Sequence, residues 1–116
     1  MASVDDVLEL LSDERRRYVL YLLTDGDTPN RIRVENLAER VAEIEADEDE
    51  TVGEESVANV TINLQHVQLP RAAEAEFVEY DPDAGVVRLL GTPPEFEALV
   101  TLAEDMERGE RTEETQ

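Results

Sequence analysis

The stretch LQHVQLPRAAEAEFVEYDPDAGVVRLL, Leu64 to Leu90, decides the fold because its pattern changes from helix to strand partway along. Its first residues continue a helix that begins near Glu54, and Pro70 bends or interrupts that helix. Phe77 to Tyr80 and Val86 to Leu90 have strand character, and the turn-forming residues DPDAG separate them. The stretch therefore predicts a helix followed by a β-hairpin.

Four further helices are expected from apolar residues at helical spacing. The first contains Val4, Val7, Leu8 and Leu11, with Ser3 available as its N-cap. The second is SDERRRYVLYLLTDGD, which Ser12 opens as capping residue and Gly26 ends. Its expected buried residues are Tyr18, Val19, Leu22 and Leu23.

Beyond the turn residues Thr28 to Asn30, alternation around Ile32 indicates one brief strand, and a third helix follows from about Val34 to Ala46. The acidic tract Ala46 to Glu55 reads as an exposed connector. Its spacing lacks the EF-hand pattern, so no metal site is expected there.

The helix from Glu54 places Val57, Val60, Leu64 and Val67 on one face, which we expect to be buried. A final helix starts at Pro93 and Pro94 and ends near Gly109.

This order of elements predicts an α+β, mainly helical fold, the winged helix-turn-helix. It combines a three-helix core, a two-stranded wing and an extra C-terminal helix. Residues 1–108 are expected to form this one domain, and residues 109–116 a disordered acidic tail. The recognition helix would be Glu54 to Gln68, and the wing Phe77 to Leu90.

Two runs, Leu11 to Leu23 and Leu64 to Leu90, resemble the small winged-helix domains that are abundant in haloarchaea and distantly similar to ArsR-type regulators. The resemblance implies DNA binding and often dimerisation, and it implies no enzyme activity. Those domains often carry glycine where this chain has Glu76, so we expect the junction between helix and wing to differ here.

Thirty acidic residues face ten basic ones, all arginine, which gives a formal net charge of -20. Molar salt shortens the Debye length to roughly 3 Å and screens such self-repulsion, so the composition favours a halophilic origin. The absence of cysteine excludes disulfides, thiolate metal sites and cysteine nucleophiles. No signal peptide or long apolar run is present, and a cytoplasmic protein without cofactor, metal or catalytic residues is expected.

Neutral side chains on the recognition helix are the expected base-reading groups. Asn59 on the outer face and Asn63 on its flank could each pair with adenine, and Ser56 lies on the flank with Asn63. The alternative is that these are only polar residues on a solvated helix face. Ile62 on the outer face fits a thymine methyl contact, a partner interface or a helix rotated from this assignment. The full set expected to contact DNA is Ser56, Asn59, Asn63, His66, Arg71 and Arg88.

Arg71 and Arg88 are placed beside the DNA backbone because helix ends and wings commonly touch it. His66 has a surface or helix-end role as its alternative. Arg15, Arg16 and Arg17 are consecutive on a helix and point in three directions, so we expect nearby acids to pair with them.

The final helix carries one apolar stripe that could form the seam of a homodimer. The alternative is packing against Val4, Val7 and Leu8 of the same chain. Two functions remain open: a DNA-binding transcription regulator that binds double-stranded DNA, and a winged-helix module that binds a protein partner instead. The stripe consists of Phe96, Leu99, Val100, Ala103 and Met106.

Overall fold

The computed structural model describes residues 4–25, 31–46, 51–75 and 77–114. Several sequence-based expectations fall elsewhere in the chain. Ser3 as an N-cap, the turn Thr28 to Asn30, residues 47–50 of the acidic tract and the junction at Glu76 lie outside the described residues.

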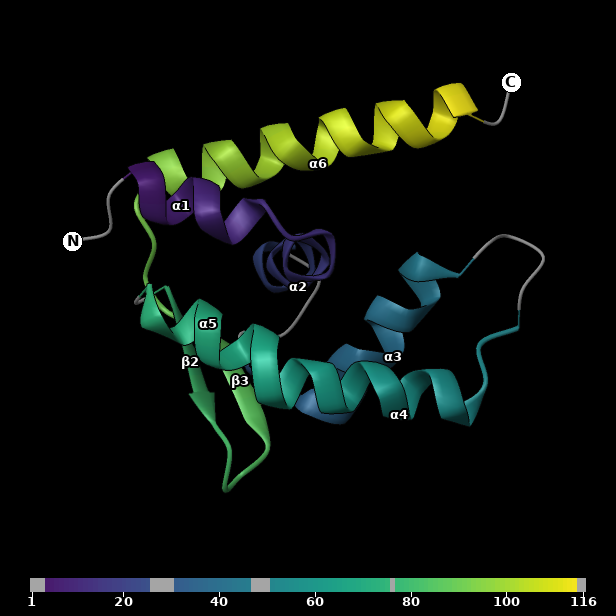
Figure 1. The fold of residues 1–116 in the computed structure, drawn as a ribbon. Helices are drawn as coiled ribbons and strands as arrows, with labels where there is room; N and C mark the ends of the chain where they lie inside the picture. The colour runs from purple at the N-terminus through teal and green to yellow at the C-terminus, as the bar shows by residue number, and fades with distance from the viewer. Residues whose placement is uncertain (1–3, 26–30, 47–50, 76, 115–116) are drawn as a thin grey trace.

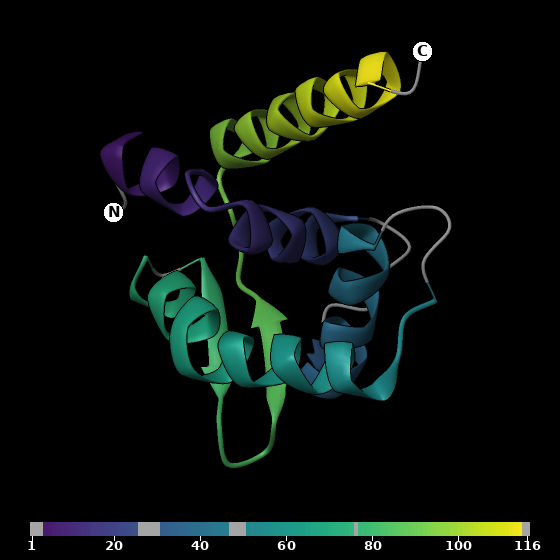
Figure 2. The same ribbon diagram turned by 45° about the vertical axis from the view of Figure 1, so that its right-hand side comes forward.

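The fold is α+β and mainly helical, with one small antiparallel sheet (Figure 1). Helix α2 occupies the centre, with α1 and α6 on one side of it and α4, α5 and the hairpin on the other (Figures 1 and 2). The elements in order are α1 Val4–Leu11, α2 Glu14–Thr24, β1 Arg31–Arg33, α3 Val34–Glu45, α4 Glu54–Asn63, the π-helical turn η1 Leu64–Gln68, α5 Leu69–Glu74, β2 Val78–Asp81, β3 Val86–Leu89 and α6 Pro94–Glu114.

The sheet has the strand order β1-β3-β2, so the brief strand near Ile32 joins the predicted hairpin as its third strand. Ile32 lies opposite Val87, and both side chains are buried. The hairpin turn contains Gly85 at φ 68°, in the left-handed region that glycine adopts without a Cβ clash. The Val34 amide donates to the Gly85 carbonyl at 2.9 Å, which ties the start of α3 to this turn.

Helix α2 is buried on more sides than its sequence pattern predicts. Leu20 and Tyr21 are buried in addition to the expected residues, whereas Leu22 is only partly buried. The reason is its central position, because α1, α3 and α6 all pack against it. Its N-cap is Asp13, whose carboxylate accepts from the Arg16 amide at 3.0 Å. The prediction that Ser12 is the N-cap is wrong by one residue, since the Ser12 hydroxyl donates to the Glu9 carbonyl instead.

Helix α1 also departs from the predicted stripe. Its buried residues are Val7 and Leu10, while Val4 and Leu8 are 67% and 51% exposed. Two apolar side chains on this short helix therefore face outward.

The helix from Glu54 continues through Pro70, but it changes register at η1. The Leu69 amide donates to the Leu64 carbonyl, five residues back, so one extra residue is accommodated in this turn. Val67, which was expected to be buried, is consequently 47% exposed, and Gln68 is buried instead. Proline and π-bulges are both common causes of helix distortion, and here the two are adjacent.

Helix α6 is attached to the domain by its first turns. Phe96 and Val100 are buried, and the Phe96 ring stacks on Phe77 with centroids 4.1 Å apart. The helix extends past Gly109 to Glu114, further than the sequence pattern predicts. Over the described part of the chain, no helix is both long and apolar enough to span a bilayer.

Candidate nucleic-acid interface

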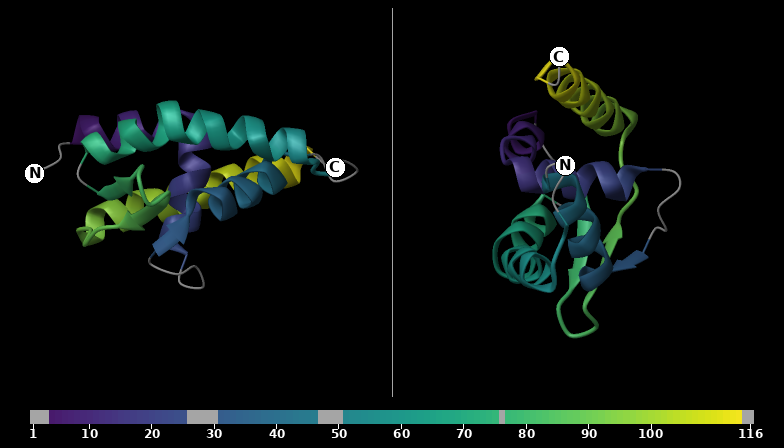
Figure 3. Two further views of the ribbon diagram at one scale, coloured as in Figure 1. Left: turned by 90° about the horizontal axis from the view of Figure 1, so that it is seen from below. Right: turned by 90° about the vertical axis from the view of Figure 1, so that its right-hand side faces the viewer.

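Helix α4 and the β2–β3 hairpin lie on the same side of the molecule, and the tip of the hairpin projects beyond the helix (Figures 1 and 2). Seen from below, α4 and α5 form one long rod with the hairpin beside it (Figure 3). The outward side chains of the rod include Glu55, Ala58, Ile62 and His66, all exposed. Ile62 is 56% exposed, so an apolar group lies near the middle of this surface.

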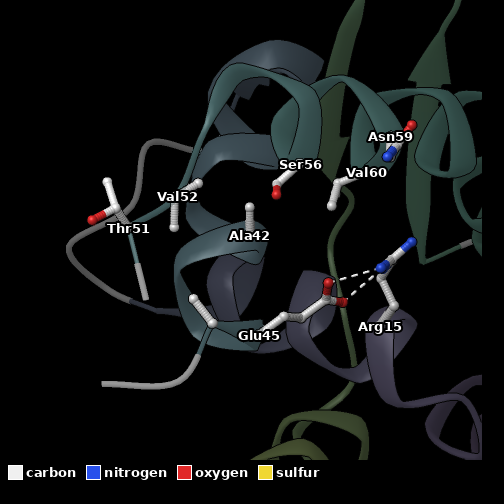
Figure 4. Close-up of a pocket in the computed structure, with 9 residues that line it drawn as sticks. Arg15, Ala42, Glu45, Thr51, Val52, Ser56, Asn59 and Val60 are labelled. Atoms are coloured by element: carbon white, nitrogen blue, oxygen red, sulfur yellow. Dashed lines mark hydrogen bonds and ion pairs between the residues drawn. The ribbon is translucent and has the colours of Figure 1, made fainter. Parts of the chain in front are cut away.

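Ser56 and Asn59 are exposed, and they occupy one flank of α4 rather than its outermost line. They line a cavity of about 280 Å³ together with Arg15 and Glu45 (Figure 4). Neither side chain hydrogen-bonds to any residue that the structure describes. Both polar groups are therefore available to a ligand that approaches this flank.

Asn63 differs from these two because it takes part in a buried network. Its side-chain oxygen accepts from Gln68 Nε2 at 3.2 Å, and the Gln68 oxygen accepts from Arg16 Nη1 at 3.3 Å. Asn63 therefore helps to hold Gln68 in place. Because its side-chain oxygen is already engaged, Asn63 has less capacity to pair with a base.

Arg16 lies at the centre of this network and is 6% exposed. Its Nε donates to the Leu10 carbonyl at 2.9 Å and its Nη2 to the Glu9 carbonyl at 2.6 Å. These carbonyls end α1, where a cation is favoured by the helix dipole. This role was not predictable, because Arg16 stands between two other arginines and arginine is rarely buried.

Arg15 and Arg17 form ion pairs on two other sides of α2, as their helical spacing predicts. Arg15 makes a two-point contact with Glu45 at 2.6 and 2.7 Å, and this hydrogen-bonded contact raises the arginine pKa. Arg17 contacts Glu107 of α6 at 3.0 Å through two nitrogens. Burial alone would raise the pKa of Glu107, but hydrogen bonds from Arg17 and Tyr21 outweigh it and lower that pKa.

The two arginines expected beside DNA are both engaged in exposed ion pairs. Arg71 contacts Glu9 at 2.9 Å, and Arg88 contacts Glu79 at 3.0 Å. The arginine side chains are 54% and 47% exposed. Exposed pairs of this kind are weak and are screened by salt, so the arginines can exchange these partners for a phosphate at little cost.

The sheet assembles a basic group that sequence reasoning missed. Arg31 lies directly opposite Arg88 in the β1–β3 pairing, and Arg33 lies two residues along on the same face. All three are exposed, and we call this group the arginine face. Like charges directly opposite each other destabilise a sheet, and Glu79, which faces Arg88 from β2, offsets part of this repulsion. The alternation Arg-Ile-Arg was visible in the sequence, but the pairing with β3 was not.

Acidic groups surround the arginine face. Arg33 pairs with Glu35 at 3.3 Å, and the hairpin turn begins at Asp81 and includes Asp83. Between Glu54 and Gln68 the sequence has neither lysine nor arginine. The positive charge of the interface is therefore confined to its strand side. Among the described residues, no three acidic, histidine or cysteine side chains are grouped as metal ligands.

The predicted dimer stripe is divided between interior and surface. Phe96 and Val100 are each 1% exposed and contribute to the chain's own core, and Leu99 and Ala103 are partly buried. Met106 is 62% exposed. Packing within the chain therefore accounts for the first half of the stripe.

Residues 8–88 match the model of a protein family described as a domain of unknown function, DUF7344, and the chain belongs to this family. The match begins halfway along α1, covers α2 to β2 and most of β3, and ends before α6. Neither the comparison with curated proteins nor the comparison with solved structures yields a match.

Proposed function

We propose that this member of the DUF7344 family is a DNA-binding transcription regulator of a halophile, with a winged helix-turn-helix fold. The order α2, β1, α3, α4, β2, β3 and the strand order β1-β3-β2 support this assignment. In this fold the last helix of the three-helix core enters the major groove and the hairpin lies by the flanking backbone. Helix α4 and its extension through Gln68 take the first role, and the hairpin takes the second.

The arginine face is the observation that carries the proposal. Three of the ten arginines in a chain of net charge -20 lie together on the exposed face of the paired strands β1 and β3. Guanidinium groups suit phosphate because they can donate two parallel hydrogen bonds to it. On this proposal Arg31, Arg33 and Arg88 contact the backbone, while α4 presents Asn59, Ala58 and Ile62 to the bases.

This distribution of charge is compatible with DNA binding in concentrated salt. Repulsion between the acidic surface and DNA falls off over roughly 3 Å in molar salt, so it acts only at close contact. The gain from counterion release also becomes small, so affinity must come from direct hydrogen bonds and from shape. A few arginines in fixed positions then contribute more than a diffuse basic surface would.

Neutralising the arginine face is expected to weaken DNA binding without changing sequence preference. Each of Arg31→Ala, Arg33→Ala and Arg88→Ala should lower affinity by about tenfold, the effect of one charge-assisted hydrogen bond. Each should also reduce the slope of log affinity against log salt by about 0.9. The measurement is fluorescence anisotropy with the gene's own upstream DNA, from about 0.2 M to molar KCl.

Two comparisons make this experiment decisive. Arg108→Ala removes an exposed arginine from α6, which lies on the other side of α2, and should leave affinity unchanged. Asn59→Ala should instead reduce discrimination at one base pair by about 1–3 kcal/mol. Wild-type protein that binds no DNA at any KCl concentration would refute the proposed function.

A homodimer formed through the α1–α6 side of the molecule is part of this proposal. Winged-helix and related regulators commonly read two half-sites as dimers. Six large apolar residues are exposed in the part of the chain that the structure describes, and four of them lie on these two helices, away from α4: Val4, Leu8, Leu102 and Met106.

Placing charge on this surface is expected to give monomers. The double substitution Leu102→Glu and Met106→Glu adds two like charges where a second copy would pack, and sedimentation velocity in molar KCl should show half the wild-type mass. The matched control is Ala98→Glu with Thr101→Glu, which adds the same charge to other exposed positions of α6. Equal masses for wild type and the Leu102, Met106 variant would rule out this interface.

One observation favours a second candidate, a module that binds a protein partner. The surface of the rod combines Glu54 and Glu55 with exposed Ile62 and Val67, and it carries neither lysine nor arginine before Arg71. Exposed apolar groups with an acidic rim fit a protein surface better than a polyanion. The DNA titration above separates the two, because a protein-binding module should show no dependence on the arginine face.

A further inference from the structure

The cavity beside α4 combines opposite charges with an apolar surface. It lies between α2, α3 and the first turns of α4 and has a volume of about 280 Å³ (Figure 4). Small-molecule sites in proteins begin near this size, at roughly 300 Å³. The cavity therefore suits a metabolite of a few heavy atoms and is too small for a nucleotide.

The charged wall is the two-point contact between Arg15 and Glu45. Arg15 donates through Nε and Nη2, which leaves the remaining guanidinium N–H groups for another acceptor. Each Glu45 oxygen accepts one of these bonds and has a further lone pair for another donor. The side chains are only 31% and 22% exposed, so a ligand would meet the pair where solvent screening is reduced. The wall offers one cationic and one anionic contact side by side.

The remaining lining provides both polar and apolar contacts. Ser56 and Asn59 point into the same space from α4 (Figure 4), and neither hydrogen-bonds to a described residue. Val52 and the buried Val60 add an apolar surface. The lining is more polar than apolar, which suits a small charged ligand with one apolar group.

We propose that this cavity binds a small zwitterion of the α-amino acid class with an aliphatic side chain. Its carboxylate accepts from the free N–H groups of Arg15, its ammonium donates to Glu45, and its side chain packs on Val52 and Val60. A simple anion would meet Glu45 and the protein's net charge of -20, and a simple cation would meet Arg15. A zwitterion satisfies both contacts and carries no net charge.

The position of the cavity gives binding a regulatory consequence, and this step rests on the proposed function. Ser56 and Asn59 face both the cavity and the exposed flank of α4. A ligand that hydrogen-bonds to them withdraws them from DNA, so ligand and DNA compete. By linkage, each should weaken the binding of the other by the same factor.

Isothermal titration calorimetry of the full chain in molar KCl tests the site without DNA. The probes are L-valine, N-acetyl-L-valine, which lacks the cation, and L-valinamide, which lacks the anion. We expect L-valine to bind, and each analogue to bind at least about tenfold more weakly, the loss of one charged hydrogen-bonded contact. Absence of L-valine binding, or equal binding of all three compounds, would overturn the proposal.

Two variants locate the binding in this cavity. Arg15→Gln removes the carboxylate contact, and Ser56→Phe fills the space from an exposed helix position while leaving the Arg15–Glu45 pair intact. Both should weaken L-valine binding at least about tenfold. Arg108→Gln breaks an ion pair elsewhere and should bind as the wild type does. Retained binding by Ser56→Phe, with its fold verified by circular dichroism, would place the ligand elsewhere.

The DNA titration repeated with saturating L-valine then tests the coupling. L-valine should reduce the DNA affinity of the wild type but not that of Arg15→Gln, which lacks the carboxylate contact and lies outside the proposed DNA-contacting set. A protein that binds L-valine but no DNA would retain the cavity assignment and lose the proposed function. A protein that binds DNA but not L-valine would retain the proposed function and lose the cavity assignment.

Discussion

Arg16→Ala is expected to lower the free energy of unfolding by about 3–4 kcal/mol. The Leu10 carbonyl and the side-chain oxygen of Gln68 lose their donor, and the Glu9 carbonyl loses one donor but keeps its bond from Ser12. A buried polar group left without a partner costs about 1–3 kcal/mol, and the lost packing of the long side chain adds to this. Urea unfolding in molar KCl, monitored by circular dichroism, measures the change.

Two further arginine variants show whether the effect depends on the network. Arg16→Lys keeps the charge, but an ammonium lacks the guanidinium fork that reaches three acceptors together, so we expect an intermediate loss. Arg108→Ala removes an arginine whose side chain is 75% exposed and should change stability by less than about 0.5 kcal/mol. Equal free energies of unfolding for Arg16→Ala and Arg108→Ala would contradict the buried, hydrogen-bonded position of Arg16.

Phe96→Ala is expected to cost about 3–5 kcal/mol, the usual loss for truncating a buried phenylalanine. Phe96 is 1% exposed and stacks on Phe77, at the base of the hairpin. The substitution therefore leaves a void where α6 joins the domain, and urea unfolding should show a lower midpoint. The family match ends at residue 88, so this result would show that α6 is a structural part of the domain in this chain.

Leu102→Ala provides the control for that experiment. Leu102 lies on the same helix but is 56% exposed, so its truncation should change stability by less than about 0.5 kcal/mol. Equal losses for the two variants would contradict the orientation of α6.

The elements of the fold were predictable from the sequence because each depends on local spacing. Helix α3 and both hairpin strands lie within a residue or two of the expected positions. The π turn was not predictable, because Leu64 and Val67 fit a regular helix and nothing local marks the extra residue. The same irregularity makes Val67 exposed and Gln68 buried, against the expectation for this face.

The candidate site was less predictable because its groups meet through distant parts of the chain. Arg88 was identified from the wing alone, whereas Arg31 and Arg33 join it only once β1 pairs with β3. Asn59 was identified as a polar residue on α4, but the cavity that it lines also needs Arg15 of α2 and Glu45 of α3. Periodicity assigns a residue to one face of its own helix or strand. Only the tertiary fold shows which residues of other elements lie next to that face.

The π turn also sets the rotation of the hairpin relative to helix α4. A helix advances by about 100° per residue, so a chain lacking one residue between Leu64 and Gln68 would rotate everything after it by that angle. Helix α5 contacts β2, and the hairpin follows α5 directly. The whole strand pair would then face another direction, and the arginine face would no longer accompany the surface of α4. A single inserted residue thus sets how the hairpin is oriented relative to α4 in this chain.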